Sequence, residues 1–115
     1  MSRLIYKICP APLWREAEER GVFTGAPIDI QDGFIHFSTA SQVQETAARH
    51  FSGQDGLFLI AVEEEELGPA LKYEVSRGGQ LFPHLYASLP VNAVRWVKPL
   101  PLGGEGGHVF PALDA

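Results

Sequence analysis

The sequence predicts a single α+β domain, and three observations lead to this prediction. The chain has 115 residues, a common size for one domain, and 45% of them are hydrophobic, which is enough for a buried core. Its apolar pattern changes between the helical period and the period of two that strands show. Strands predominate in the second half, which favours an α+β arrangement over a regular alternation of strands and helices.

The first strand and helix are predicted close to the N-terminus. Residues 4–8 alternate and are rich in β-forming side chains, which is typical of a strand. A helix over residues 12–20 follows, because Pro12 suits a first helical turn and Gly21 suits the position after a helix. Residues 22–31 contain glycine and proline and indicate a loop.

A second strand and helix follow this loop. The strand covers residues 34–38, and an Asp32-Gly33 turn leads into it. Thr39 or Ser41 has the spacing of a helix cap before the next segment. That segment reads as a helix packed by one face, whose apolar stripe consists of Val43, Ala47 and Phe51.

The second half is predicted to consist mainly of strands. Residues 57–62 form an uninterrupted apolar run, which is typical of a central strand buried on both faces. The remaining predicted segments are a solvated turn at 63–66, a strand at 71–76, a short compact segment at 82–86 and a last strand at 94–98. We therefore expect one domain over residues 1–102 and a loosely ordered, glycine-rich tail over 103–115.

Composition and charge exclude several classes of partner. The net charge is −5, and the nine basic residues are scattered, which argues against DNA binding. Cys9 is the single cysteine, so no internal disulfide can form. The chain contains no apolar run of about 20 residues and begins without a signal-peptide pattern. We expect a cytoplasmic protein without a membrane partner.

The strand at 34–38 carries the first candidate site. Alternation places His36 and Ser38 on the same face of this strand. Ser38 and Thr39 also precede the predicted helix, whose free N–H groups and dipole favour an anion. The three side chains suit a phosphate or a ribose. The alternative is that Ser38 and Thr39 only cap the helix and that His36 is a hydrogen-bonded core residue.

His84 and Glu74 are the second candidates. His84 follows a proline and lies among apolar residues, a setting in which a titratable ring often marks a site. Glu74 lies on the polar face of its predicted strand. His36, His84 and Glu74 form an alternative metal-binding set, although their spacing is not that of close ligands, and Ser38 forms a weaker alternative as a hydrolase nucleophile.

Several motifs together resemble an uncharacterised bacterial family, the domain-of-unknown-function family nine-five-two. The two most specific segments are Asp32–Thr39, which reads DGFIHFST, and Phe82–Tyr86, which reads FPHLY. The resemblance covers roughly residues 4–100. It also includes Tyr6, Lys7, Ile8, Trp14, Ala17, Gly21, Gln42 and Glu74.

More remotely, the chain resembles the ADP-ribosyltransferase fold, nearest to the RNA 2′-phosphotransferases. This resemblance implies a small mixed or antiparallel split sheet with two main helices, and a cleft for NAD between the strands. His36 and Ser38 would then face the nicotinamide ribose, and Tyr6 and Lys7 would line the same pocket. Lys7 occupies the position at which the phosphotransferases have a histidine.

These observations leave three hypotheses. The first is a transferase of the ADP-ribosyltransferase type that uses NAD or a related nucleotide, with His36, Glu74 and His84 as catalytic residues. The second is a non-catalytic sensor of a nucleotide-like small molecule. The presence of Lys7 in place of the histidine of the phosphotransferases favours this hypothesis. The third is a small hydrolase or metal enzyme that uses His36 and His84. We do not expect an RNA substrate, because the chain is too short for the additional RNA-binding lobe of the phosphotransferases.

Overall fold

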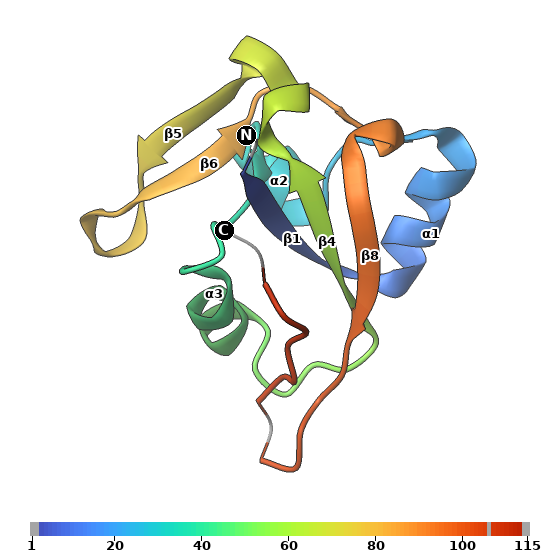
Figure 1. The fold of residues 1–115 in the computed structure, drawn as a ribbon, viewed down its shortest axis with the longest axis vertical. Helices are drawn as coiled ribbons and strands as arrows, with labels where there is room; N and C mark the ends of the chain where they lie inside the picture. Colours follow the sequence, from blue (N-terminus) through green and yellow to red (C-terminus); the bar gives the residue numbers. More distant parts are fainter. Residues whose placement is uncertain (1–2, 106, 114–115) are drawn as a thin grey trace.

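The computed structural model describes residues 3–105 and 107–113 and confirms the predicted α+β fold. Residues 1–2, at the start of the predicted domain, and residues 106 and 114–115, in the predicted tail, lie outside the described residues. The described strands form three antiparallel sheets, and α-helices pack around them (Figure 1). None of the described helices combines the length and the apolar content that crossing a membrane requires.

The first sheet contains the longest strands and provides the core. Its order is β1–β4–β8, with β1 at Leu4–Pro10, β4 at Leu57–Glu63 and β8 at Val94–Leu100. The central position of β4 confirms the prediction made from the apolar run at 57–62. A strand that is covered on both faces needs apolar side chains at successive positions.

Alternation along β1 divides the core into two clusters, one on each face of this sheet. Ile5 packs in the cluster that contains Trp14 of the first helix. Tyr6 packs in the cluster that contains Val43 of the third helix. Lys7 shares the face of Ile5 by alternation and is nevertheless buried. The apolar core therefore surrounds the charged side chain of Lys7.

The second sheet has the order β3–β6–β5, and an isolated backbone bridge between Tyr6 and Ser38 connects it to the first. Its strands are β3 at Ile35–His36, β6 at Leu81–Leu85 and β5 at Leu71–Val75. Tyr6 of β1 and Ser38 exchange two backbone hydrogen bonds, of 2.8 and 2.9 Å. The two sheets diverge from this pair, and β5 and β6 extend away from the body of the molecule (Figure 1).

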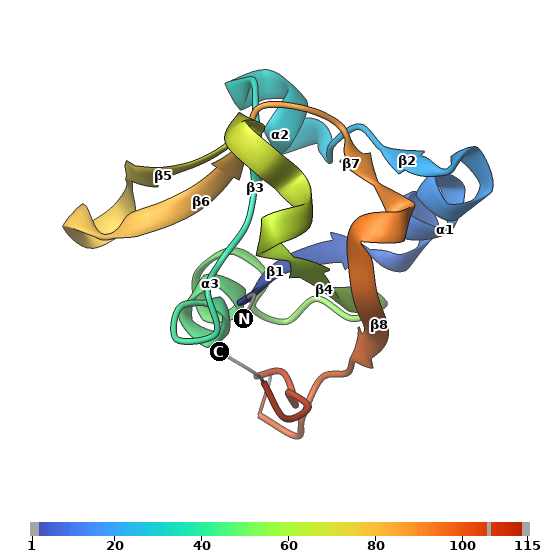
Figure 2. The same cartoon turned by 45° about the horizontal axis from the view of Figure 1, so that its top comes forward.

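The helices cover opposite sides of the first sheet. The structure places α1 at Ala11–Arg20, α2 at Pro27–Asp32 and α3 at Val43–His50. In Figure 1, α1 and α3 lie on either side of β1 and β4. Figure 2 shows α2 above β3, next to the third and smallest sheet, in which β2 pairs with β7. The remaining elements are β2 (Val22–Phe23), β7 (Leu89–Pro90), η1 (Glu64–Ala70), η2 (Arg77–Gly79) and η3 (Val91–Ala93).

Three local predictions were wrong. Residues 22–31 are not a loop but contain β2 and most of α2. Gly33 has φ 87° and closes α2, so Asp32-Gly33 is a helix end and not a hairpin turn. The segment 82–86 belongs mostly to the strand β6, because Phe82 and His84 pair with β5, and His84 and Leu85 pair with β3.

The C-terminal tail contacts the body of the molecule at several of its described residues. Leu102 and His108 form an isolated β-bridge, and Nε2 of His108 lies 2.7 Å from the carbonyl oxygen of Gln54. Phe110 and Leu113 pack against the cluster on the α3 face. Two apolar side chains of the tail therefore contribute to the core on the α3 side of the first sheet.

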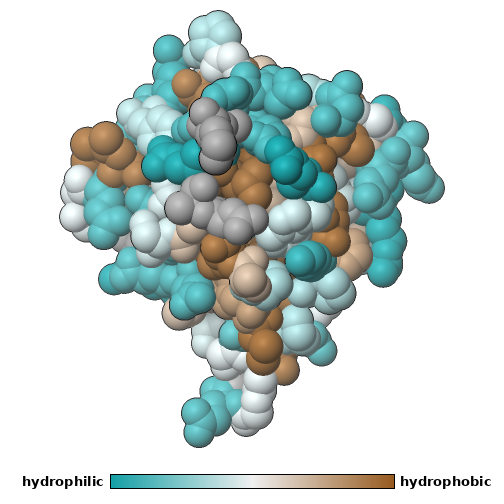
Figure 3. Space-filling view, viewed as in Figure 1, coloured by the Kyte–Doolittle hydropathy of each residue, from teal (hydrophilic) through white to brown (hydrophobic). Residues whose placement is uncertain are grey.

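Large apolar side chains remain exposed at the free end of the second sheet. Val75 and Leu81 are cross-strand partners on β5 and β6, and they are 69% and 52% exposed. Figure 3 shows hydrophobic residues at this end of the molecule and others down the middle of the same face.

Candidate functional site

A cavity of about 630 Å³ opens where the two larger sheets diverge. Tyr6 and Ser38, the pair that joins the sheets, both line this cavity. Lys7, His36 and His84, also predicted as site residues, line it as well. Further lining side chains come from α2 and from the end of α3, and they include Ile28, Asp32, Thr46, His50 and Phe51.

His36 and His84 lie directly opposite each other in neighbouring strands. They are register partners in the β3–β6 pair, and their ring centroids lie 5.6 Å apart. Because facing residues of an antiparallel pair project from the same side of the sheet, both rings reach the same cavity. The structure therefore brings together two histidines that are 48 positions apart in the sequence.

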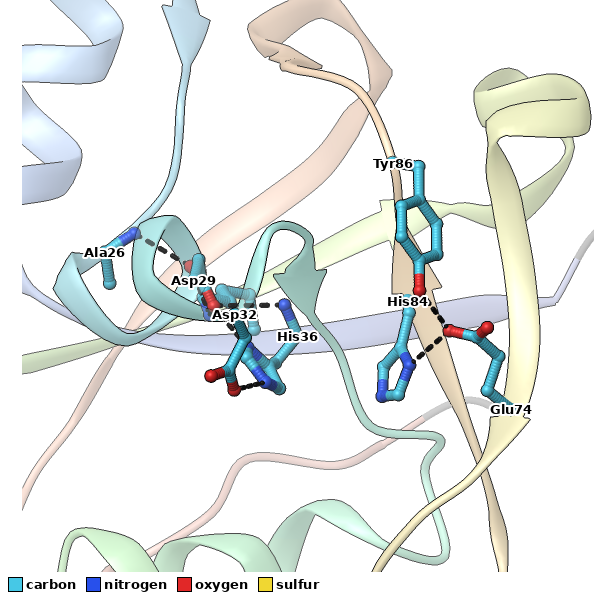
Figure 4. A network of polar contacts seen from close by, with 8 residues as sticks. Ala26, Asp29, Asp32, His36, Glu74, His84 and Tyr86 are labelled. Carbon is cyan, nitrogen blue, oxygen red and sulfur yellow. Dashed lines mark hydrogen bonds and ion pairs between the residues drawn. The ribbon is translucent and has the colours of Figure 1, made fainter.

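Asp29 holds one of these histidines in place. Its Oδ1 lies 2.6 Å from Nδ1 of His36 and accepts a 3.1 Å hydrogen bond from the backbone N–H of the same residue. Its Oδ2 accepts a 2.7 Å hydrogen bond from the N–H of Ala26, at the start of α2. Asp29 is only 2% exposed, so this carboxylate acts as a buried anchor for β3 and α2 (Figure 4).

Lys7 supplies the positive charge that faces Asp29. Its Nζ lies 2.9 Å from Oδ1 and 2.8 Å from Oδ2 of Asp29, and both side chains are buried. Burial favours the neutral form of Asp29, but the hydrogen bond from His36 and the charge of Lys7 outweigh burial and lower the pKa of this carboxyl to about 2. Burial also lowers the pKa of Lys7, and the Asp29 carboxylate opposes that change.

The outer nitrogen of His36 faces a second carboxylate. Nε2 lies 3.0 Å from Oδ2 of Asp32, the last residue of α2. A carboxylate oxygen only accepts hydrogen bonds, so both contacts of the ring are hydrogen bonds when each ring nitrogen carries a proton. His36 is thus held between a buried carboxylate and a half-exposed one (Figure 4).

His84 has a carboxylate partner of its own. Its Nδ1 lies 2.8 Å from Oε1 of Glu74 on β5, and the Tyr86 hydroxyl donates a 2.7 Å hydrogen bond to the same oxygen. The hydrogen bonds from Tyr86 and His84 lower the pKa of Glu74, and the bond to Glu74 raises the pKa of Tyr86. Glu74 does not line the cavity but contacts His84, which does.

An aromatic ring fixes the plane of His84. Phe34 stacks on it with centroids 4.0 Å apart and an angle of 26° between the rings. The same phenyl ring also contacts His36, at a centroid distance of 4.5 Å. Phe34 therefore restrains both imidazoles, and it also lines a second, smaller cavity.

Ser38 and Thr39 are arranged differently from the prediction. The Ser38 hydroxyl lies 2.9 Å from that of Thr46 on α3, and both residues line the cavity. Thr39 does not line it, and its hydroxyl lies 3.2 Å from that of Ser41. Neither Thr39 nor Ser41 caps the helix with its side chain, because α3 begins at Val43 after Gln42. Ser38 and Thr39 therefore precede the first turn of α3 and do not lie at its N-terminus.

The alternative metal set is not assembled. Within the described ranges, no group of three or more His, Cys, Asp or Glu side chains could hold a metal ion. Glu74 contacts the Nδ1 atom of His84 and has no such contact with His36. The carboxylate orients one histidine and does not converge with the pair on a common point.

Asp29 and Asp32 are site residues that the sequence interpretation missed. They belong to the segment that was predicted as a loop and a turn. The signals of a helix were nevertheless present, since Pro27 suits a first turn, an acidic residue follows at the third helical position, and Gly33 suits the helix end. Recognising α2 would have placed both carboxylates one turn apart, near His36.

A protein-family model with the description "Protein of unknown function (DUF952)" matches residues 8–97. The crystal structure of protein CC0527 from Caulobacter crescentus is 49% identical, has a TM-score of 0.89, and the match covers 92% of this chain and 93% of that one. Its solution NMR structure is 50% identical, with a TM-score of 0.82 and 90% coverage of each chain. No curated protein shows significant similarity.

Proposed function

Because the chain belongs to the DUF952 family, whose description is "Protein of unknown function", we propose a function from the geometry of the cavity. We propose that the His36–His84 cavity binds a nucleotide-like small molecule, with NAD as the first candidate. The proposed reaction is a transfer from that nucleotide, of the ADP-ribosyltransferase type. The observation that carries the proposal is the facing pair of histidines, each oriented by a carboxylate.

The position of the cavity supports a nucleotide ligand. It lies beside the Tyr6–Ser38 pair at which the two sheets diverge, and a cleft between diverging sheets is what the likeness to ADP-ribosyltransferases implies for NAD. Four of the five residues expected to contact the cofactor line it, namely Tyr6, Lys7, His36 and Ser38. Thr39 would contact only an extended ligand. The volume, about 630 Å³, falls within the usual range for small-molecule sites.

The two histidines support chemistry as well as binding. A carboxylate on Nδ1 fixes the ring orientation of each imidazole. Within the described residues, Nε2 of His84 has no hydrogen-bond partner, so it is available to a ligand. We therefore assign His84 as the residue that moves a proton, Glu74 as its positioning carboxylate, and His36 as the residue that orients the ligand.

A second candidate function is general acid–base hydrolysis without a nucleotide. The observation that favours it is the Lys7–Asp29 ion pair, because the lysine charge is already balanced and is not available to a diphosphate. The facing histidines alone would then act on a small ester or phosphodiester. A sensor without catalysis would use the same residues for binding only.

Titration with NAD separates these functions. At about 100 times its dissociation constant, a ligand stabilises the folded state by roughly 2.7 kcal/mol, which raises the midpoint of thermal unfolding by several degrees. We expect such a rise for the wild type and its loss in His36→Gln and His84→Gln. The matched control is His108→Gln, outside this cavity.

Release of free nicotinamide, measured by chromatography, then identifies an enzyme. We expect release from the wild type with an acceptor mixture and none from His84→Gln. Binding without release would indicate a sensor. If NAD, ADP-ribose and AMP all fail to stabilise the wild type, nucleotide binding is wrong, and hydrolysis of a nitrophenyl phosphodiester becomes the measurement of choice.

A further inference from the structure

The Asp32 carboxylate contacts the outer ring nitrogen of His36, Nε2, at the edge of the cavity. Its Oδ2 lies 3.0 Å from Nε2, and the Asp32 and His36 side chains are 38% and 33% exposed. Both side chains line the cavity. The hydrogen bond between Asp32 and His36 is therefore accessible to a ligand that enters the cavity from solvent.

The two carboxylates on His36 differ in how firmly they are held. Asp29 is 1% exposed in its side chain and also binds Lys7 and the N–H of Ala26. Within the part of the chain that the structure describes, His36 is the one hydrogen-bond partner of the Asp32 side chain. Asp29 therefore cannot leave without breaking a buried network, whereas Asp32 can turn into solvent at the loss of a single contact.

We propose that the cavity takes a small molecule that carries an oxyanion, and that this oxyanion replaces the Asp32 carboxylate at Nε2 of His36. The inference rests on the proposed function in one respect, since it takes the His36–His84 cavity as the binding site. It adds the class of chemical group that binds there, a phosphate or a carboxylate, and the side chain that it displaces.

The chemistry of the contact supports this exchange. A carboxylate oxygen already accepts at this position, and a phosphate oxygen makes the same charge-assisted hydrogen bond. Asp29 keeps the ring oriented from its other side, so Nε2 continues to point outward when Asp32 leaves. Ile28, Phe51 and Phe82 also line the cavity and provide apolar surface for the rest of the ligand.

Removal of the displaced carboxylate should strengthen anion binding. We would titrate inorganic phosphate and, separately, acetate into the wild type and into Asp32→Ala by calorimetry. Asp32 competes as an intramolecular ligand, so its removal should tighten binding of the preferred anion on the order of tenfold. The anion whose affinity increases more in Asp32→Ala, phosphate or acetate, indicates whether the ligand carries a phosphate or a carboxylate.

Two controls separate displacement from a general change in charge. Glu18→Ala removes the same charge from the exposed face of α1 and should bind as the wild type does. Asp32→Ala/His36→Gln should lose the gain. In Asp32→Ala itself, phosphate or acetate should shift the ¹⁵N signal of the His36 ring, a measurement that needs no substitution of the histidine.

Equal binding by Asp32→Ala and Glu18→Ala, or a gain that persists in the double variant, would overturn the inference. The outcome is independent of NAD. Binding of NAD without a gain in Asp32→Ala would contradict the displacement alone, whereas a gain for phosphate without NAD binding would contradict the nucleotide proposal alone.

Discussion

Asp29 holds His36 at two points, since one carboxylate oxygen lies 3.1 Å from the backbone nitrogen and 2.6 Å from Nδ1 of the same residue. The contact to the backbone connects β3 to α2, and the contact to the ring orients the imidazole. Through Lys7, the same carboxylate also connects β3 to β1. The position of His36 therefore depends on a buried ion pair.

Substitution of Asp29 should be strongly destabilising. Asp29→Asn leaves the Lys7 ammonium buried without a counter-charge, and breaking a buried pair in this way costs about 3–5 kcal/mol. Urea unfolding of the wild type, Asp29→Asn, Lys7→Met and the double variant measures this. We expect the double variant to lose less than the sum of the single losses. Strict additivity would show that the pair is not coupled.

The same carboxyl should make stability depend on acid pH. An Asp with a pKa near 3.9 in the unfolded chain and about 2 in the folded one contributes roughly 2.6 kcal/mol. Because the folded pKa is the lower one, this contribution is complete above about pH 5 and is lost as the pH falls towards 2. Urea unfolding at a series of pH values should show the wild type approaching Asp29→Asn in acid. A difference that stays constant would contradict the assigned pKa.

Gly33 should affect both stability and the site. It closes α2 with φ 87°, and a Cβ added there meets nothing within 4 Å, so Gly33→Ala costs only backbone strain of about 1–2 kcal/mol. Gly21, which closes α1 with φ 80° and equally open surroundings, is the matched control. Both alanine variants should unfold earlier in urea. Only Gly33→Ala, next to Asp32, should alter phosphate binding.

Glu74 should affect the orientation of His84 more than it affects folding. Its side chain is 39% exposed, so Glu74→Gln should leave the unfolding midpoint close to that of the wild type. The ring ¹⁵N signals of His84 should change, because Nδ1 loses its charged partner. Tyr86→Phe, which removes the other hydrogen bond to the same oxygen, should change them less. Identical His84 signals in Glu74→Gln and the wild type would show that this pair does not form in solution.

Several elements could be predicted because their signals are local. The apolar run at 57–62 indicates a central strand, and β4 lies between β1 and β8. The Val43 and Ala47 stripe indicates a helix packed by one face, and both side chains are buried on α3. The prediction for residues 22–31 failed because Gly25 and Pro27 were interpreted as loop signals, although Pro27 is the first residue of α2.

The sequence by itself determined which residues are candidates. The alternation at 34–38 and the proline before His84 identified both histidines, and the resemblance at residues 32–39 and 82–86 indicated the family that the chain matches over residues 8–97. These are properties of single segments, and they do not depend on how distant strands pair. Periodicity says which side of a strand a residue faces but nothing about what lies opposite it.

Only the tertiary structure decided what the histidines face. Register between β3 and β6 places His36 opposite His84, and register between β5 and β6 brings Glu74 close to His84. The buried Lys7–Asp29 pair joins residues 22 positions apart, and neither sequence segment shows that its charge will be buried. The physical reason is that pairing and burial depend on long-range packing. Whether burial of a charged side chain stabilises or destabilises the fold therefore depends on the partner that the tertiary structure places beside it.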